Sequence, residues 1–361
     1  MKRTSTIYLI LCVMLLCSFE ALARERRSFY SGARGLAMGG AQIATVNDET
    51  ALLVNPAALG KLRDVYGTIF DPELEATNSI GQMNRGSSIS NPFKIEDVKN
   101  TLNTSREAYY HAKAQVFPSI VMRNFGIGIY GNYLLDGEMN AAGTNMDMYY
   151  RSDLALVAGY NLRLFDGRIK IGVNAKMINR IEVDNQTINP AGSLDMASIG
   201  ATEGTGLSTD VALMLAAPWD WLPTITAVAH DVGGTSFTAS NGLRMTTANR
   251  PNSLRQDIDV AMALFPIHAN RVRSSWTVEY RSLLTGSEEE DKAKLIHAGA
   301  ELNFSDMFFL RAGYNQRYFT GGFEIASERM QVQIATYGEE IGTSANPRED
   351  RRAVVKFAFR F

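Results

Sequence analysis

The sequence has only two cysteines, Cys12 and Cys17, and both lie near its start. The remainder of the chain can therefore form no disulfide and carry out no thiol chemistry. No run of about 18 or more apolar residues follows residue 23, so no transmembrane helix is predicted. The chain has 36 lysines and arginines and 38 aspartates and glutamates. This near balance gives no reason to expect a nucleic-acid partner.

Histidine is also scarce. The four histidines (His111, His230, His268 and His297) are scattered and have no ligand-like spacing, so no metal site is expected. His230 and Asp231 form the only candidate pair for acid-base chemistry. In a strand, neighbouring side chains point to opposite faces, so Asp231 is expected to face lipid or pack against a loop rather than orient His230. The sequence therefore predicts no enzyme activity, no catalytic residue and no cofactor.

The first 23 residues have the pattern of a Sec signal peptide. Lys2 and Arg3 precede an apolar run over residues 7–19, and Ala21-Leu22-Ala23 follows as a small-x-small cleavage site. A lipoprotein is the alternative because Cys17 lies near the end of the apolar run. Leu16, directly before Cys17, is bulky where a small residue would be expected. We therefore expect residues 1–23 to be a signal peptide and the protein to be exported.

Apolar and polar residues alternate along many segments, among them 169–177, 257–264, 272–280 and 296–304. At the end of the chain, Phe357, Phe359 and Phe361 share one face while Lys356 and Arg360 lie on the other. A period of two with an aromatic last residue is typical of the closing strand of an outer-membrane barrel. An ordinary edge strand with a wet face is the alternative for this segment alone. Phe357, Phe359 and Phe361 are the expected barrel-assembly signal.

The lengths of the connections give an independent test, because outer-membrane barrels alternate short periplasmic turns with longer outer loops. Short joins occur at Asn124, 165–167, 218–221, 267–270, 305–306 and 327–328, with longer joins between them except at 316–317. The sequence predicts an all-β transmembrane antiparallel barrel of about fourteen strands over residues 64–361, with both barrel termini periplasmic. The candidate strands are 64–71, 112–123, 125–138, 147–162, 168–184, 204–217, 222–232, 253–266, 270–284, 293–304, 307–316, 317–328, 329–339 and 351–361.

Residues 24–63 do not fit the barrel pattern. This segment is rich in small residues and contains Ser31-Gly32, Gly39-Gly40-Ala41, Asp48 and Asn55-Pro56-Ala57. Glycine permits positive φ and close backbone approach, which suits a compact insert in a barrel lumen. In the second candidate strand, Pro118 can interrupt the ladder and is a possible kink in the wall, although a lone proline can equally lie at a bulge.

These N-terminal residues resemble the FadL-type family of outer-membrane transporters for hydrophobic compounds, which includes toluene and long-chain fatty-acid channels. The matching positions are Ser31, Gly32, Gly39, Gly40, Asp48, Asn55, Pro56 and Ala57. The resemblance implies a fourteen-stranded, porin-like barrel in a Gram-negative outer membrane, with residues 24–63 folded into the lumen as a hatch (plug). The motif covers about thirty residues, and members linked to secretion or conjugation carry a similar stretch.

The resemblance implies uptake of hydrophobic or amphipathic compounds, such as long-chain fatty acids or aromatics, by passive diffusion past the hatch. In that family the ligand leaves the lumen laterally through a gap in the wall. The alternative is a non-transporting barrel that serves as a scaffold or accessory of a secretion or conjugation-type system. The expected partners are outer-membrane lipid, a hydrophobic small-molecule ligand and the barrel-assembly machinery. Charges inferred to face the lumen are expected to pair with one another, and any apolar pocket is expected at the 72–111 and 185–203 loops.

Overall fold

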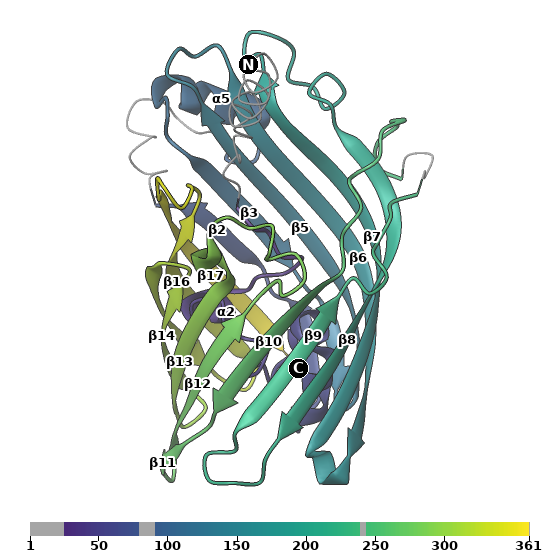
Figure 1. Cartoon of the computed structure of the whole chain (residues 1–361), viewed down its shortest axis with the longest axis vertical. Coiled ribbons are helices and arrows are strands. Elements are labelled where there is room, and N and C mark those ends of the chain that lie inside the picture. Colours follow the sequence, from purple (N-terminus) through teal and green to yellow (C-terminus); the bar gives the residue numbers. More distant parts are fainter. Residues whose placement is uncertain (1–24, 79–90, 239–242, 361) are drawn as a thin grey trace, which may run out of the picture.

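The computed structural model describes residues 25–78, 91–238 and 243–360, which form a closed antiparallel β-barrel (Figure 1). Three wall strands consist of two segments each, β1–β2, β3–β4 and β10–β11, so the seventeen labelled segments make fourteen wall strands. The barrel closes because β17 pairs antiparallel with both β1 and β2. The predicted fold class is confirmed. The predicted signal peptide, 1–23, and Phe361 lie outside the described residues.

The wall segments follow one another around the barrel with antiparallel pairing throughout. Their bounds are β1 (Tyr66–Phe70), β2 (Glu73–Thr77), β3 (Tyr110–Val116), β4 (Ser119–Met122), β5 (Phe125–Met139), β6 (Met146–Leu164), β7 (Ile169–Ile188), β8 (Thr202–Ala216), β9 (Thr224–His230), β10 (Asp257–Leu264), β11 (Ile267–Ala269), β12 (Val272–Tyr280), β13 (Ile296–Phe304), β14 (Phe308–Asn315), β15 (Tyr318–Ala326), β16 (Met330–Glu340) and β17 (Glu349–Arg360).

Short and long connections alternate around the barrel as predicted. The end of the barrel with the β4–β5, β6–β7 and β8–β9 joins is the short-turn end, and the opposite end is the long-loop end. Asn124 in the β4–β5 turn has φ 72°, a left-handed conformation that asparagine tolerates in tight turns. The β14–β15 join at the long-loop end is tight, and its Gln316 has φ 59°.

The first wall strand is longer than predicted. The expected strand at 64–71 stops before Pro72, but the wall continues as β2, which pairs with both β17 and β3. Proline lacks the amide hydrogen that a ladder needs, so it interrupts the strand without ending it. The expected 72–111 loop is shorter for this reason, and its described part contains the helix α5 (Ile95–Thr104).

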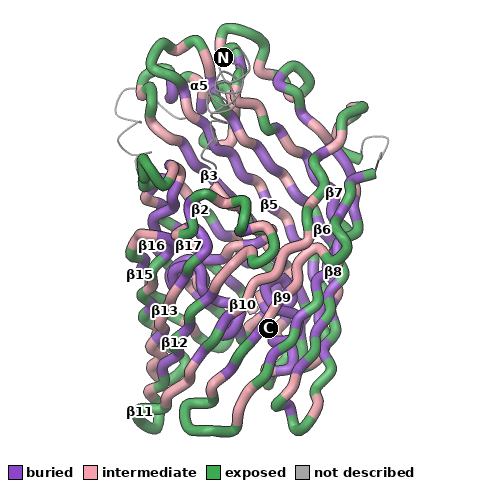
Figure 2. The backbone as a smooth tube through the Cα atoms, viewed as in Figure 1, coloured by how far each residue is buried: buried purple, intermediate pink, exposed green. Residues whose placement is uncertain are grey.

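Apolar side chains cover the outside of the wall. Exposed and buried residues alternate along the strands in Figure 2. On β6, for example, Leu154, Leu156 and Leu162 are exposed, whereas Asp153, Ala155 and Val157 are buried. Trp276 and Val278 on β12, and Phe357 and Phe359 on β17, face outward in the same way. An apolar outer surface is the condition for a barrel to sit in lipid.

The wall is not equally tall on all sides. β5, β6 and β7 have 15, 19 and 20 residues, whereas β12 to β15 have 8 or 9. Figure 1 shows these long strands rising beyond the rest of the wall, near α5. The exposed apolar residues of β6 end at Leu154, and Ser152, Tyr150 and Met148 above it are covered by other parts of the chain.

Residues 25–62 lie inside the lower half of the barrel, where Figure 1 shows them as a purple segment enclosed by strands. Their helices are α2 (Ala33–Ala37), α3 (Ala51–Val54) and the 3-10 helix η1 (Pro56–Lys61). α2 contacts β14, β15, β16 and β17, whereas η1 contacts β6, β7 and β8 on the other side. The other short helices are η2 (Phe165–Gly167) and η3 (Lys292–Leu295). Among the described residues, no helix is long and apolar enough to cross a bilayer.

Candidate functional site: the lumen, the N-terminal segment and the wall break

One side of the N-terminal segment is held by apolar packing. Leu52, Leu59 and Ala57 are fully buried and belong to one apolar cluster with inward-facing residues of β4 to β10. The wall residues of this cluster are Val121, Tyr130, Ala155, Val157, Ile178, Ala212, Met214, Val228, Ala261 and Ala263. Small and branched side chains on this half of the wall leave room for the helices of the segment.

The opposite side of the segment is held by charged and polar wall residues. Arg34 donates to Glu301 at 3.0 Å and to Asp48 at 2.9 Å, and Glu301 also accepts from Arg311 at 2.7 Å. The Glu279 carboxylate accepts from the Gln42 amide at 2.8 Å. Burial alone would raise the pKa of Asp48, but Arg34 outweighs it and holds the pKa well below its usual range. The predicted mutual pairing of the lumen charges is therefore present on this side of the barrel.

The Asn55-Pro56-Ala57 motif makes specific contacts with the wall. The Asn55 amide donates to the Ile43 carbonyl at 2.7 Å and to Thr226 Oγ1 at 3.0 Å, and its Oδ1 accepts from the Ala57 amide at 2.9 Å. Pro56 begins η1, where its missing amide hydrogen costs nothing. Ala57 lies against Gly172 of β7, where any side chain would overlap the Pro56–Ala57 backbone.

The other motif residues also contact the wall. Gly39, at φ 69°, lies against the backbone of Ala298 and Tyr314, and Gly40 has φ 85°. Only glycine combines this backbone conformation with so close an approach. Gly32 is the N-cap residue of α2. Ser31 Oγ accepts from Lys113 Nζ at 2.6 Å. These contacts fix the positions of the motif residues against the wall. The role of these residues in a movable hatch stays a prediction.

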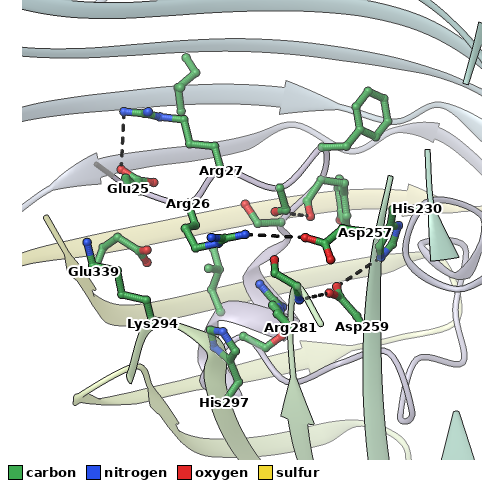
Figure 3. Close-up of a pocket in the computed structure, with 18 of the residues that line it drawn as sticks. Glu25, Arg26, Arg27, His230, Asp257, Asp259, Arg281, Lys294, His297 and Glu339 are labelled. Carbon is green, nitrogen blue, oxygen red and sulfur yellow. Dashed lines mark hydrogen bonds and ion pairs between the residues drawn. The ribbon is translucent and has the colours of Figure 1, made fainter. Parts of the chain in front are cut away.

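Above the segment lies a cavity of ≈ 620 Å³, shown in Figure 3. Its described lining contains ten acidic and ten basic side chains together with His111, His230 and His297. Apolar contributions come from Phe29, Leu36, Ile43, Leu53, Val54, Leu134 and Leu254. The cavity is therefore polar and close to charge balance.

Residues 25–27 cross this cavity and are bound to three sides of the barrel. Glu25 accepts from Arg352 of β17 at 2.8 Å, and Arg27 donates to Asp136 of β5 at 2.5 Å. Arg26 points the other way, toward Asp257 at 3.7 Å, as Figure 3 shows, and donates to Thr285 at 2.8 Å. Burial alone would raise the pKa of Glu25, but Arg352 and Arg27 lower it overall. The start of the described chain is thus held by buried ion pairs.

His111 lies in this network, which sequence spacing did not reveal. Its Nδ1 is 2.6 Å from Asp136 Oδ1 and its Nε2 is 2.9 Å from Glu75 Oε1. Glu25, His111 and Asp136 could together offer three ligand atoms to a metal ion, all within 4.8 Å of one another. A cation there would compete with Arg27 and Arg352 for the same carboxylates. Glu25, His111 and Asp136 therefore form part of an ion-pair network.

Asp231 does not face lipid, one of the two placements that strand alternation predicted for it. His230 and Asp231 both line the cavity. β9 ends at His230, and Asp231 has φ 50°, so strand alternation does not extend to it. Asp231 accepts from Ser208 Oγ at 2.6 Å, whereas His230 Nε2 lies 3.2 Å from Asp259. His230 and Asp231 therefore do not form an acid-base pair. That the protein has no enzyme activity stays a prediction.

Two adjacent wall strands are interrupted at the same height. The first breaks at Asp71-Pro72 and the second at Phe117-Pro118, where the Phe117 amide donates to the Asp71 side chain at 2.5 Å and not to a backbone carbonyl. Pro118, the predicted kink, lies in this second break. On the outside, Ile69, Phe70 and Ile129 are exposed.

An aromatic cluster separates the cavity from this break. Tyr130 of β5 lies at its centre, with ring centroids 5.0 Å from Phe29, 5.8 Å from Tyr30 and 6.5 Å from Phe117. Phe29 and Tyr30 line the cavity, and Phe117 is fully buried beside the break. The cluster is apolar, in contrast to the cavity above it.

The apolar residues of the upper loops do not line the lumen. Leu102 of α5 packs against Gly137, which alternates with the inward-facing Asp136 and so lies on the outer face of β5. Met148, Tyr150 and Ile181 belong to the same cluster, together with Ile199 of the 185–203 segment. Arg244 joins its own loop to the outer faces of β6 and β7 by donating to Ser152 at 2.8 Å and to Asn179 at 2.6 Å. The expected apolar pocket at these loops is therefore a packed outer-face cluster in the described residues.

We expect Lys61 to make stability depend on pH. Burial, reinforced by Arg34 and Lys170, lowers the pKa of Lys61 to about 7, while Asp48 and Glu301 only partly oppose this. The unfolded chain keeps the ordinary pKa near 10.5, so between about pH 7 and 10 it binds more protons and stability should rise with pH. Denaturant unfolding in micelles should show a smaller rise for Lys61→Met. The exposed-site variant Lys94→Met should match the wild type, and parallel curves for all three would contradict the assignment.

Known protein sequences and solved structures were compared with this chain. No protein-family model and no curated protein sequence matches the chain. The crystal structure of the Pseudomonas putida toluene transporter TodX matches with a TM-score of 0.55 at 11% identity, over 94% of this chain and 100% of that chain. A deltaS2 mutant of the TodX monoaromatic hydrocarbon channel matches with a TM-score of 0.53 at 13% identity, over 92% and 99%. At such identity the likeness concerns the fold. The chain thus has the fold of the FadL-type barrels that its N-terminal residues resemble.

Proposed function

We propose that this protein is an outer-membrane channel that takes up hydrophobic or amphipathic compounds by passive diffusion. The apolar outer wall fits lipid, and the short-turn end fits the periplasm, as in other outer-membrane barrels. The fold shared with a toluene transporter supports the same proposal. Residues 1–23 would act as the export signal, and Phe357, Phe359 and Phe361 as the signal to the barrel-assembly machinery.

The observation that carries the proposal is the pair of wall breaks beside an aromatic cluster. A compound in the cavity would pass Phe29, Tyr130 and Phe117 and leave between the strand segments at Pro72 and Pro118. Apolar surface gains about 25 cal/mol per Å² when it leaves water. A lateral exit into lipid keeps that gain, whereas an exit through the lower lumen would have to pass the packed N-terminal segment.

We propose that residues 24–63 act as the hatch, with Ser31, Gly32, Gly39, Gly40, Asp48, Asn55, Pro56 and Ala57 as its motif. Asn55 supports this role because its amide joins two parts of the segment to Thr226 of β9. A hatch that moves must exchange such contacts for others. The ion pairs of residues 25–27 belong to the same closed arrangement.

Two substitutions should change uptake in opposite directions. Asn55→Ala removes hydrogen bonds worth about 1–3 kcal/mol in total, which would raise an open population by about 5- to 150-fold and speed uptake accordingly. Pro118→Ala restores an amide hydrogen to the wall, so the exit should narrow and uptake should slow. The measurement is uptake of oleate and of toluene by vesicles containing the purified protein.

Asn189→Ala, at an exposed loop position, is the matched control and should behave as the wild type. Opposite effects of Asn55→Ala and Pro118→Ala cannot arise from general loss of folded protein. If the wild type neither binds nor transports either compound, the transport proposal is wrong. The non-transporting scaffold would then be favoured, and the paired charges of the cavity already fit it.

A further inference from the structure

Asn132 of β5 is a buried amide without a hydrogen-bond partner in the described structure. The residue is 5% exposed, and neither Nδ2 nor Oδ1 is bonded to any described group. A buried amide usually has partners, because leaving it unpaired is costly. This position therefore has a hydrogen-bonding capacity that the closed structure does not use.

The position of Asn132 connects the cavity with the wall break. Tyr130, two residues earlier on the same face of β5, belongs to the aromatic cluster beside the break, and Leu134, two residues later, lines the cavity. Leu134 pairs across the sheet with Arg151, another cavity residue, and Asn132 pairs with Asp153 in the next row. Asn132 thus lies one cross-strand pair below the residues that line the cavity. It is on the path from the cavity to the wall break by which we propose that the ligand leaves.

The neighbours of Asn132 bind the chain that covers it. Arg151 donates to the Ser28 carbonyl at 3.1 Å, Tyr130 to the Phe29 carbonyl at 3.2 Å and Gln115 to the Ser31 carbonyl at 2.7 Å. Gln115 and Asp153 are the cross-strand partners of Asn132 on its two sides. Asn132 lies among these residues and takes no part in holding residues 28–31, so a role in anchoring this segment does not explain it.

The charged side chains around Asn132 already have partners among the described residues. Asp153 accepts from Arg180 at 2.7 Å and lies 3.5 Å from Arg151 Nε. Lys113 pairs with Glu75 at 3.1 Å, and Glu73 accepts from Gln115 Nε2 at 2.9 Å. An ionic group brought to this row would have no free counter-charge. An uncharged group that both donates and accepts hydrogen bonds would match the two free sides of the amide.

We propose that Asn132 binds the uncharged polar head of an amphipathic ligand, a primary amide or similar group, while the apolar part of the ligand lies against Tyr130 and Phe117. This inference rests on the proposed transport function and narrows its substrate class. A simple hydrocarbon or a carboxylate would then bind more weakly, because the first leaves Asn132 unpaired and the second adds an unbalanced charge.

The test compares decanamide, decanoate and decane, which share a chain and differ in the head. Binding to the full-length protein in vesicles is corrected for partition into protein-free vesicles. We expect decanamide to bind at least tenfold more tightly than the other two. Asn132→Leu should lower decanamide affinity about tenfold and leave decane unchanged. Asn132→Leu should also raise the denaturation midpoint, since it removes an unpaired buried amide. Asn132→Ala should show the same loss of decanamide binding if Leu proves too bulky.

Asn179→Leu is the matched control. Asn179 is equally buried, but its amide donates to Glu203 at 3.1 Å and accepts from Arg244 at 2.6 Å on the outer face. This variant should lose stability and keep decanamide binding. A higher midpoint for Asn132→Leu with unchanged decanamide binding would show that Asn132 is merely hydrated and would overturn the inference. If decane or decanoate binds as well as decanamide, or if none of the three binds, the inference fails; uptake of oleate and toluene decides the transport proposal separately.

Discussion

Arg352→Met is expected to destabilise the barrel by about 3–5 kcal/mol, the usual cost of removing one partner from a buried ion-pair network. Arg352 is 1% exposed and donates to Glu25 and to Asp350, at 2.8 and 2.6 Å. Methionine fills much of the same volume but leaves Asp350 without this counter-charge and Glu25 with only its 4.0 Å pair to Arg27 among the described residues. Unfolding by guanidinium chloride in detergent micelles would measure the loss, and protease digestion would report whether residues 25–31 become accessible.

The preceding residue on the strand provides the control. Arg351 faces outward, its side chain is 40% exposed, and its ion pair with Glu349 lies 3.2 Å apart at the surface. Exposed pairs contribute about 0–1 kcal/mol, so Arg351→Met should have little effect. Equal losses for Arg351→Met and Arg352→Met would mean that the network around Glu25 does not stabilise the fold.

Gly172→Val is expected to displace the N-terminal segment and to open the lower lumen to ions. Any side chain at Gly172 overlaps the backbone of Pro56 and Ala57, which cannot shift without moving η1. Overpacking of this kind costs about 1–3 kcal/mol, and the segment can relieve it by leaving its place between β6, β7 and β8. Single-channel recordings in planar bilayers should show a higher conductance than the wild type.

Gly321→Val is the corresponding control on β15. Its nearest neighbouring atom is the Arg311 carbonyl oxygen at 3.6 Å, an ordinary contact, so valine fits there. Conductance and stability should stay close to those of the wild type. Unchanged conductance for Gly172→Val, with the protein folded, would show that residues 25–62 are not what closes the lumen.

The wall was predictable from sequence because its determinants are local. Side chains alternate with a period of two, so residues such as Trp276 and Val278 had to share a face wherever β12 lay. The tight turns were recognisable from residues such as Asn124, and Pro118 marked an interruption that lies between β3 and β4. The interruption at Pro72 was not predicted, because the polar β2 after it did not look like a wall strand, since Glu73 and Glu75 face the lumen there.

The predictions that failed depended on contacts between distant segments. Asp231 was assigned by alternation, but the strand ends one residue earlier and the chain turns back into the lumen. The 72–111 and 185–203 segments were recognised as apolar, yet they cover the outside of β5 to β7 because those strands rise above the rest of the wall. No local pattern indicates how tall neighbouring strands are relative to one another.

By itself the sequence determined the barrel class, the number of wall strands, the alternation of short and long connections and the likeness of the N-terminal segment to a known motif. Only the tertiary structure decided which groups meet in the lumen: Glu25 with Arg352, His111 between Glu75 and Asp136, and Asn132 with no hydrogen-bond partner among the described residues. The physical reason is that strand pattern and turn type depend on neighbours in the chain. Lumen contacts depend on the register of every strand and on barrel closure, which join residues far apart in sequence.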